Sequence, residues 1–316
     1  MKIGFYRDIR KFQGGHLKVW DYFNHCLKHP GFRPKIAFSE DSDWSLNNPW
    51  FTIREKIAHA DVKLTECSVL FVAGSDWSFF LKNPSFEKKI IINLIQGFSH
   101  TVPSDEKFQY LTRKAIRICV SDELKHEVLR TQRVNGPLFT IPNGINATEI
   151  VVEKQKEQGE RVLIVGYKEP IMAAALYEIL SGENISSVEL LVDDSLPRKV
   201  FLQKIANSSI VVFLPFSLEG FFLPALEAML FDTLVICPDC TGNRSFCLSR
   251  YNCLFPDYSI DSIMASIKEA CFLSPQQRSV MISNANRTSR SSFDNEKKLF
   301  NNILDNLNSI WNDEYV

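Results

Sequence analysis

The sequence LEGFFLPALEAM, residues Leu218–Met229, places two glutamates eight positions apart directly after a short apolar run. That run, IVVFLP at Ile210–Pro215, is typical of a buried strand, and the residues after Pro224 are typical of a helix. Proline suits the first turn of a helix, because its missing N–H would have had no helical partner there. The pattern predicts Glu219 in the turn at the carboxyl end of a strand and Glu227 about one turn into the helix. Open α/β sheets bind their ligands at that edge.

The spacing of Glu219 and Glu227 limits what they can do together. Eight residues of helix span about 12 Å and rotate by about 80°, so the two carboxylates cannot share one proton as a catalytic dyad does. They can instead accept hydrogen bonds from two parts of one long ligand, such as the sugar and the ribose of a nucleotide sugar. The amides between them, which could bind its diphosphate at the helix entry, belong to Gly220, Phe221, Phe222 and Leu223. Two glutamates that only complement a helix dipole are the alternative.

Length and composition describe an ordinary globular protein. The 316 residues suggest two domains, and 45% hydrophobic against 23% charged residues are enough for sizeable cores. No stretch approaches the roughly 18 apolar residues that a membrane span needs. The apolar run at Ile3–Tyr6 is too short for a signal peptide, so we expect a cytoplasmic location, with the inner face of the membrane as a further option.

Charge is distributed unevenly along the chain. Residues 1–150 hold 21 lysines and arginines against 16 aspartates and glutamates, whereas residues 151–316 hold 15 against 21. The basic first half suits an anionic acceptor or peripheral contact of the N-terminal domain with a membrane, and solvated faces that differ in charge are the alternative. No basic stripe with interleaved aromatic residues is dense enough to predict a nucleic-acid partner.

The cysteines do not predict a disulfide scaffold or a metal site. Four of the eight lie close together in the sequence, at Cys237, Cys240, Cys247 and Cys253. A zinc ribbon needs two close pairs, and only Cys237–Cys240 has the spacing of one. Cys237 also ends an apolar run, so we expect it to pack as a small hydrophobic side chain. We therefore expect no metal.

Short apolar runs alternate with helical patterns along the first half of the chain, which is typical of a parallel sheet covered on both faces. Two of the helical stretches are Gly15–Lys28 and Asp122–Thr131, the second with Ser121 as its N-cap. The strands expected here are Ile3–Tyr6, Lys35–Phe38, Val69–Ala73, Ile90–Ile95, Ile116–Val120 and Leu138–Ile141.

A polar segment at residues 146–160 reads as a linker, and the alternation then begins again. The expected strands are Arg161–Val165, Val188–Val192, Ile210–Leu214, Leu234–Cys237 and Cys253–Phe255. The expected helices are about 170–181, 197–206, 223–231 and 259–272, with a last one over Phe293–Trp311. The sequence therefore predicts an α/β protein with two doubly wound, Rossmann-like parallel-sheet domains that face a cleft. We expect them at 1–145 and 146–292.

On these residues the chain resembles the retaining glycosyltransferases of the GT-B fold, in the group of glycosyltransferase family 4 type that includes sucrose synthases and bacterial mannosyltransferases. Their hallmark is a glutamate, seven residues and a second glutamate, in a context close to EGFGLPxLEAM. Other matches lie along most of the chain, at Gly14–Gly15, Pro142–Gly144, Val165–Gly166 and Thr241–Arg244. In the family the last helix usually crosses back to the first domain, which implies that residues from about 293 to 316 pack on it.

The resemblance implies a role for each matching residue. Glu219 would accept hydrogen bonds from the sugar hydroxyls, the amides after it would bind the diphosphate, and Glu227 would hold the ribose. His100 would face the donor sugar as a catalytic residue, with His16 as a competitor for that role. Gly14 and Gly15 would let the backbone approach the donor phosphate, and a simple strand–helix turn is their alternative.

Two positions depart from the family pattern. Tyr167 stands where the family commonly has an arginine that neutralises the diphosphate. Because charge develops on that leaving group, some cation must serve. Lys168 is the first candidate and Arg244 the second, and Arg198 with Lys199 follow. Phe222 replaces a family glycine, which predicts less space above the sugar.

The resemblance as a whole implies a nucleotide-sugar-dependent glycosyltransferase that retains anomeric configuration and uses neither a metal nor another cofactor. The donor is its substrate, and a glycan or lipid-linked glycan of cell-surface polysaccharide biosynthesis is its expected acceptor. A nucleotide-sugar epimerase of the same fold is one alternative. A non-catalytic sugar-nucleotide-binding subunit, which Tyr167 motivates, is the other.

Overall fold

The computed structural model describes residues 1–58, 63–153, 159–183, 185 and 187–312. The chain divides into two compact units, Met1–Asn143 with Asn295–Val316, and Gly144–Asp294. Each unit is built on its own parallel sheet, and each is described below by itself. The centre of the expected linker, 154–158, and the last residues of the chain, 313–316, lie outside the described residues.

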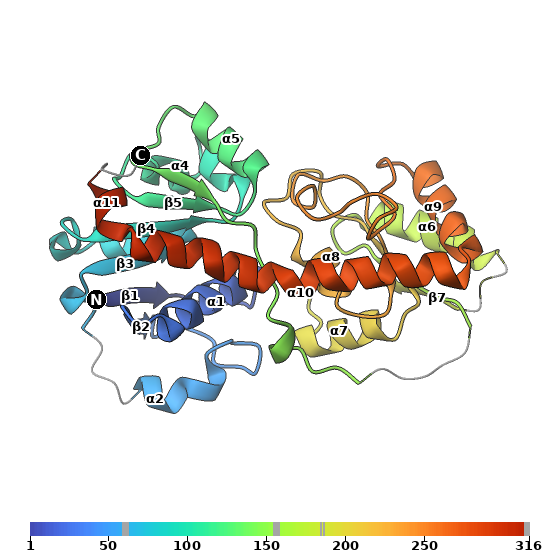
Figure 1. Ribbon diagram of the computed structural model, residues 1–316, viewed down its shortest axis with the longest axis horizontal. Helices are drawn as coiled ribbons and strands as arrows, with labels where there is room; N and C mark the ends of the chain where they lie inside the picture. The colour runs from blue at the N-terminus through green and yellow to red at the C-terminus, as the bar shows by residue number, and fades with distance from the viewer. Residues whose placement is uncertain (59–62, 154–158, 184, 186, 313–316) are drawn as a thin grey trace. The chain divides into compact units, whose positions relative to one another are not determined.

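The first unit contains a six-stranded parallel sheet in the order β2-β1-β3-β4-β5-β6 (Figure 1). Its strands are β1 Lys2–Arg7, β2 Arg33–Phe38, β3 Val69–Ala73, β4 Ile90–Ile95, β5 Ile116–Cys119 and β6 Leu138–Thr140. All six strands predicted from the apolar runs are confirmed, with ends that move by at most two residues. The reason is that strands buried on both faces are apolar throughout, which makes them conspicuous in a sequence.

Helices cover both faces of this sheet. Phe71 on β3 packs against Tyr22 of the first helix and Phe300 of the C-terminal helix, while its neighbours Leu70 and Val72 face a second apolar cluster. The α-helices before residue 143 are α1 Gly14–Lys28, α2 Arg54–Ala58, α3 Trp77–Leu81, α4 Glu106–Tyr110 and α5 Asp122–Arg130. Short 3-10 helices lie at η1 Phe51–Ile53, η2 Leu64–Glu66, η3 Gly74–Asp76, η4 Pro84–Phe86 and η5 Phe98–Thr101.

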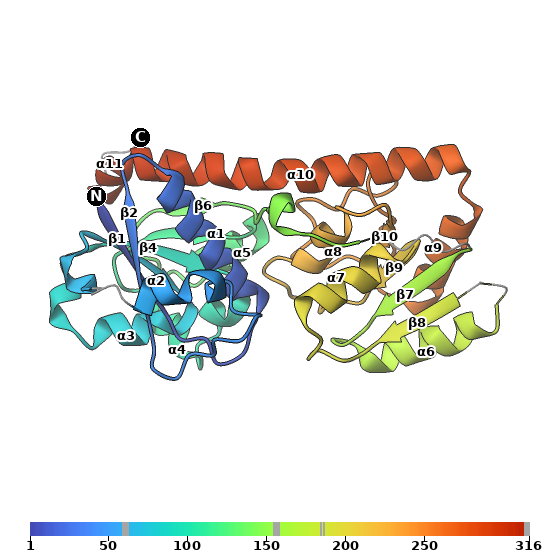
Figure 2. The ribbon, with the colours of Figure 1, turned by 90° about the horizontal axis from the view of Figure 1, so that it is seen from below.

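The second unit contains a four-stranded parallel sheet in the order β10-β9-β7-β8. The strands are β7 Arg161–Val165, β8 Ser187–Leu191, β9 Ile210–Phe213 and β10 Leu234–Ile236. The helices are η6 Ala147–Glu149, α6 Pro170–Ser181, α7 Arg198–Ala206, α8 Leu223–Ala228 and α9 Ile260–Phe272. Helices α7 and α8 cover one face of the sheet and α6 and α9 cover the other (Figure 2).

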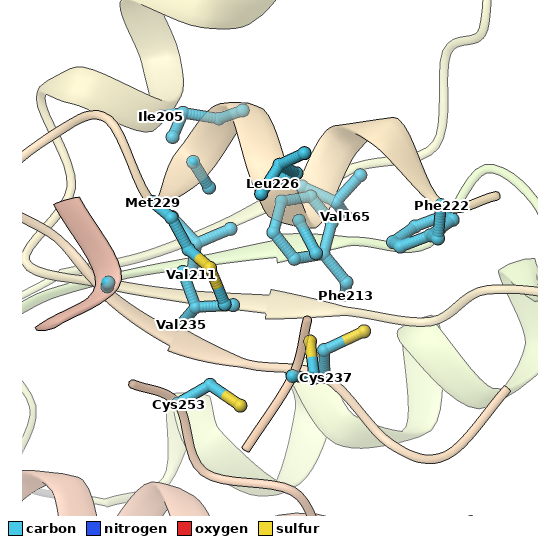
Figure 3. Packing of buried hydrophobic residues seen from close by; sticks show 14 of the residues in the cluster. Val165, Ile205, Val211, Phe213, Phe222, Leu226, Met229, Val235, Cys237 and Cys253 are labelled. Carbon is cyan, nitrogen blue, oxygen red and sulfur yellow. The ribbon is translucent and has the colours of Figure 1, made fainter. Parts of the chain in front are cut away.

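The core under α8 fixes the loop that carries Glu219. Val165 and Phe213, at the ends of β7 and β9, point toward Phe222 and Leu226 around the start of that helix (Figure 3). The rings of Phe213 and Phe222 meet edge to face at 5.6 Å, and both are almost fully buried. Aromatic pairs prefer this arrangement because the positive ring edge meets the negative face. The packing therefore anchors the chain on both sides of Glu219.

One predicted strand is wrong. Residues Cys253–Phe255 form only isolated bridges, between Leu254 and Ile236 and between Cys253 and Ser249. Cys237 is fully buried among apolar side chains, as its position after an apolar run predicted. In the part of the chain that the structure describes, no three His, Cys, Asp or Glu side chains are grouped so that they could hold a metal ion. A reaction without metal remains a prediction.

The C-terminal helix is longer than its sequence pattern suggests. Helix α10 runs from Pro275 to Asp305, and α11 follows at Leu307–Trp311, whereas the sequence predicted a start at Phe293. The early turns of α10 bury small or polar residues such as Ala285 and Ser289, whose hydroxyl donates to the carbonyl of Leu226 at 2.7 Å. A buried stripe of small residues has little apolar signal, so its period is easily missed. No described helix is both long enough and apolar enough to cross a membrane.

Candidate functional site

Glu219 lies in the loop that follows β9, at the carboxyl edge of the second sheet. Its carboxylate oxygen Oε1 accepts a hydrogen bond from the Phe216 amide at 3.2 Å and pairs with Lys168. Its backbone is held by Thr241, whose hydroxyl accepts from the Glu219 amide at 2.8 Å and donates to the Glu219 carbonyl at 2.7 Å. The first motif glutamate is thus fixed at both its backbone and its carboxylate.

Lys168 is the cation that reaches this carboxylate. It follows β7, and its ammonium lies over the rings of Phe216 and Phe222, 5.4 Å and 5.2 Å from their centroids. The exposed fractions of the Lys168 and Glu219 side chains are 21% and 14%, so a ligand can still reach the pair. The first of the cations proposed from the sequence therefore contacts the first of the two glutamates.

Glu227 lies on α8 and is buried, with an exposed fraction of 5%. Arg198, the first residue of α7, donates to its Oε1 from Nε at 3.1 Å and also from Nη2. Oε2 has no partner among the described residues. Because a buried carboxylate needs a counter-charge, Arg198 pairs with Glu227 and orients it while leaving one oxygen for a ligand.

Tyr167 lies close enough to Glu219 and Glu227 for their negative charges to affect its phenol. Burial, followed by the negative charges of Glu219 and Glu227, raises the pKa of its phenol far above the ordinary value. The hydroxyl therefore keeps its proton at neutral pH and offers a neutral donor where the family has a charged arginine. The positive charge of this site comes from Lys168 and Arg198 instead.

The backbone amides between the two glutamates are less available than the sequence predicted. The Phe222 amide donates to the Gly242 carbonyl at 2.8 Å, and the Leu223 amide donates to the Phe221 carbonyl at 3.2 Å. Helix α8 has only six residues, so its dipole is small. Of these four amides, those of Gly220 and Phe221 have no acceptor among the described residues. The expected four-amide anion site is therefore corrected to two amides.

Two further expectations about the second unit need correction. Phe222 was expected to narrow the space above a bound sugar, but its ring is 2% exposed and packs inward on Phe213, which leaves little of it to face a ligand. Arg244 forms a two-bond pair with Asp239, at 2.8 Å and 2.7 Å, and this fixed geometry holds its guanidinium more firmly than the single contact with Glu219 holds Lys168. Both side chains of that pair are almost half exposed. Arg244 is thus a weaker candidate for binding a diphosphate than Lys168.

In the first unit, His100 is buried in η5 rather than exposed in a loop. Its Nδ1–H donates to the Gly97 carbonyl at 3.4 Å, and its Nε2 is buried without a partner in the described structure. Burial lowers the pKa of His100 to about 4, so the ring is neutral at pH 7. Contact between this ring and a sugar stays a prediction, one that the buried position does not favour.

His16 and the two glycines lie at the start of α1. Burial and the charge of Arg7 lower the pKa of His16 to about 4, and Arg7 donates to its Nδ1 at 2.5 Å. Gly14 and Gly15 are the first residues of the helix, after Gln13 as its N-cap. A Cβ on Gly15 would come within 3.2 Å of the side chain of Gln96, so the Gln96 side chain lies close to the backbone at the start of α1.

Comparison with known proteins identifies the fold. No protein-family model and no curated protein sequence matches the chain. The Anabaena protein HepE, in complex with UDP, matches with a TM-score of 0.69 at 14% identity, over 96% of this chain and 100% of its own. Sucrose-phosphate synthase from Thermosynechococcus elongatus also reaches 0.69, at 12% identity over 98% of this chain and 99% of that one. The fold is GT-B.

A third similar structure has been assigned a different activity. A Listeria monocytogenes protein assigned as a UDP-N-acetylglucosamine 2-epimerase matches with a TM-score of 0.54 at 13% identity, over 93% of each chain. HepE has also been solved in complex with UDP-glucose. At these identities the likeness establishes the GT-B fold and leaves the reaction to be argued from the site.

Sequence reasoning missed several residues of this GT-B site. Phe216 and Thr241 hold Glu219 through backbone contacts, which no sequence pattern reports. Arg198 was already a candidate cation from the sequence, but its pairing with a glutamate was not predicted, although a cation in the first turn of a helix opposes the helix dipole. A local conflict of this kind often marks a functional or paired residue, and here the partner is Glu227.

The close approach of Gly242 to the Glu219 loop gives a first prediction. A Cβ at Gly242 would lie 2.7 Å from Cβ of Glu219 and 2.9 Å from Cα of Phe221. We expect Gly242→Ala to destabilise the second unit by about 1–3 kcal/mol, because the loop must move to admit the methyl group. Calorimetry measures the loss. Gly182→Ala is the matched control, since its Cβ would meet only the Ile179 carbonyl at 3.5 Å. Equal stability of the two variants would contradict this packing.

Proposed function

We propose that this protein is a retaining glycosyltransferase that takes a sugar from a nucleotide-sugar donor bound on its second unit. The observation that carries the proposal is the arrangement of two shielded, ion-paired glutamates and one accessible lysine at the carboxyl edge of the second sheet. Two carboxylates and a cation at one sheet edge suit a ligand with a sugar, a diphosphate and a ribose. The GT-B fold, which HepE shares in its complexes with UDP and UDP-glucose, supports the same ligand class.

Each group of the site has a chemical task in this proposal. Glu219 accepts hydrogen bonds from the sugar hydroxyls, and Glu227 accepts from the ribose through Oε2. Lys168 and the amides of Gly220 and Phe221 bind the diphosphate and stabilise the charge that develops on it as it leaves.

The proposed reaction needs no protein nucleophile. The bond from the sugar C1 to the phosphate oxygen breaks while the acceptor oxygen bonds to C1 on the same face. Attack on that face conserves the anomeric configuration, and the acceptor proton passes to the departing phosphate oxygen. His100 stays outside this scheme because its ring is buried. We expect activity to persist when divalent metals are removed with a chelator.

We place the acceptor, a glycan or lipid-linked glycan, on the first unit near the start of α1. The net basic character of residues 1–150 suits an anionic acceptor or contact with an anionic membrane surface. Polysaccharide assembly on the cytoplasmic side of a membrane is the biological setting that we infer. This part of the proposal rests on fold analogy and charge, so it is tested after the donor.

The donor is identified first by thermal shift with UDP-, GDP-, dTDP- and CMP-sugars. The product is then followed by NMR, which resolves the anomers and shows whether a new glycosidic bond has formed. An epimerase, which the Listeria neighbour makes a specific alternative, would instead invert a sugar carbon on the nucleotide without any acceptor. Binding without turnover of any donor would point to a non-catalytic subunit. Product with inverted anomeric configuration would refute retention.

Glu227→Gln provides the second prediction. The variant keeps the shape of the side chain but removes the charge that accepts a ribose hydroxyl, so we expect nucleoside diphosphate affinity to fall about 10-fold or more. Isothermal titration calorimetry measures it. With the 2′,3′-dideoxy nucleoside diphosphate as ligand, the wild type and Glu227→Gln should bind with equal affinity, because that ligand has no ribose hydroxyl to donate. An equal loss for both ligands would contradict the ribose assignment.

A further inference from the structure

Lys168 contacts three residues of one loop, the segment between β9 and α8. Its ammonium pairs with Oε1 of Glu219 and lies over the rings of Phe216 and Phe222. Phe216 also donates its backbone amide to that same Oε1 at 3.2 Å. One residue therefore contacts both members of the ion pair, the cation through its ring and the anion through its N–H.

The two ion pairs of the site differ in how firmly they are held. Arg198 directs two N–H groups of its planar guanidinium at one oxygen of the buried Glu227. Lys168 is a point charge on a flexible stem, so it can turn toward a new anion without losing a fixed geometry. The aromatic faces attract the ammonium but do not neutralise it. A new anion can therefore displace Glu219 from Lys168 more easily than it can displace Glu227 from Arg198.

A diphosphate is such an anion, and it would compete with Glu219 for the same cation. While Lys168 is paired with Oε1, that oxygen is less able to accept a hydrogen bond from a sugar hydroxyl. When the ammonium turns to the diphosphate, Oε1 keeps only the Phe216 amide and becomes available. Binding of the diphosphate by Lys168 therefore promotes binding of the sugar by Glu219.

We propose that Lys168 is an exchangeable counter-ion, which leaves Glu219 for the diphosphate when a nucleotide donor binds, with Phe216 as the residue that positions it. This inference rests on the proposed function of the site. It adds that binding of the diphosphate frees the carboxylate of Glu219 to accept a hydrogen bond from the sugar. A free sugar therefore binds poorly until a nucleoside diphosphate is present. Phe216 is half exposed and therefore acts through Lys168 rather than through the core.

A double-mutant cycle on Glu219 and Lys168 tests the exchange. The measured quantity is the Kd of the nucleoside diphosphate that binds best, obtained by calorimetry. Glu219→Gln removes the competitor of the diphosphate, so we expect it to tighten binding several-fold. In the Lys168→Met background the same change should have no effect, because no counter-ion is left to release. Unchanged or weaker binding in Glu219→Gln, or the same gain in both backgrounds, would overturn the exchange.

The role of Phe216 is tested with an exposed neighbour as the control. Phe216→Leu removes the ring but keeps an apolar side chain, and we expect it to weaken nucleoside diphosphate binding by about 3- to 10-fold, as a lost cation–π contact implies. Affinity for the corresponding nucleoside, which has no phosphate, should not change. Leu218→Ala, in the same loop and 64% exposed, should leave both affinities at the wild-type level. Equal affinities for Phe216→Leu and Leu218→Ala would remove Phe216 from the proposal.

These outcomes separate the exchange from the function on which it rests. A wild-type protein that binds no nucleoside diphosphate refutes the donor assignment and the exchange together. A wild-type protein that binds it, but shows no coupling in the cycle, refutes only the exchange. Free glucose or another free sugar gives an independent readout, since its binding should strengthen when the nucleoside diphosphate is present in the wild type and should not do so in Lys168→Met.

Discussion

Glu219→Gln lowers glycosyl transfer by about 10²–10³-fold, the loss expected when one group that stabilises the transition state is removed. The glutamine has the same shape but carries no charge, so it binds the sugar hydroxyls more weakly as the leaving group departs. Nucleoside diphosphate affinity rises several-fold, because Lys168 no longer has to leave a carboxylate to reach the diphosphate. Turnover is followed by the release of nucleoside diphosphate in the presence and absence of acceptor.

Glu189→Gln is the matched control for this prediction. Glu189 forms an ion pair with Lys204 in the same unit, and its side chain is 42% exposed, against 14% for Glu219. Loss of an exposed pair costs little, so this variant should keep full activity and stability. If Glu219→Gln turned over donor as fast as Glu189→Gln, Glu219 would have no part in the reaction and the central assignment would fail.

Lys18→Met destabilises the first unit by about 3–5 kcal/mol, the range measured when one partner of a buried ion pair is removed. Lys18 on α1 is fully buried and lies 2.6 Å from Asp21 and 2.7 Å from Glu296 of α10. Burial lowers the pKa of Lys18, but the charges of Asp21 and Glu296 more than offset this and raise it overall. Without the ammonium, two buried carboxylates are left without their shared cation. His25, whose own pKa is lowered by burial, also contacts Glu296, at 2.9 Å.

Tryptophan fluorescence in a urea titration measures this loss selectively. The five tryptophans of the chain, which include Trp50 and Trp77 in the core of the first unit, all lie within residues 1–143 or 295–316. Their signal therefore follows the first unit, whereas circular dichroism follows both units. Lys28→Met on the exposed side of the same helix is the control and should shift the midpoint very little. Equal shifts for Lys18→Met and Lys28→Met would show that the buried cluster does not stabilise the unit.

Much of the fold could be predicted from residues that act locally. The parallel strands are continuous apolar runs because both of their faces are covered, and Ser121 caps α5 through its own side chain, accepting from Leu124 at 3.3 Å. The start of α10 could not be predicted in the same way. Its early turns bury small side chains such as Ala285 and Ser289, which become apolar positions only when a partner surface is present.

The sequence by itself determined the two parallel-sheet units and placed Glu219 and Glu227 at the edge of one sheet, because strands, turns and helix starts depend on neighbouring residues. Only the tertiary structure decided which cations form ion pairs with these two glutamates. Lys168 is 51 residues from Glu219, and Arg198 is 29 residues from Glu227. Contacts over such separations depend on how β7, α7 and the loop after β9 pack, and no local pattern encodes that. For the same reason the Phe222 amide, free by sequence, is already bonded in the folded chain, to the carbonyl of Gly242.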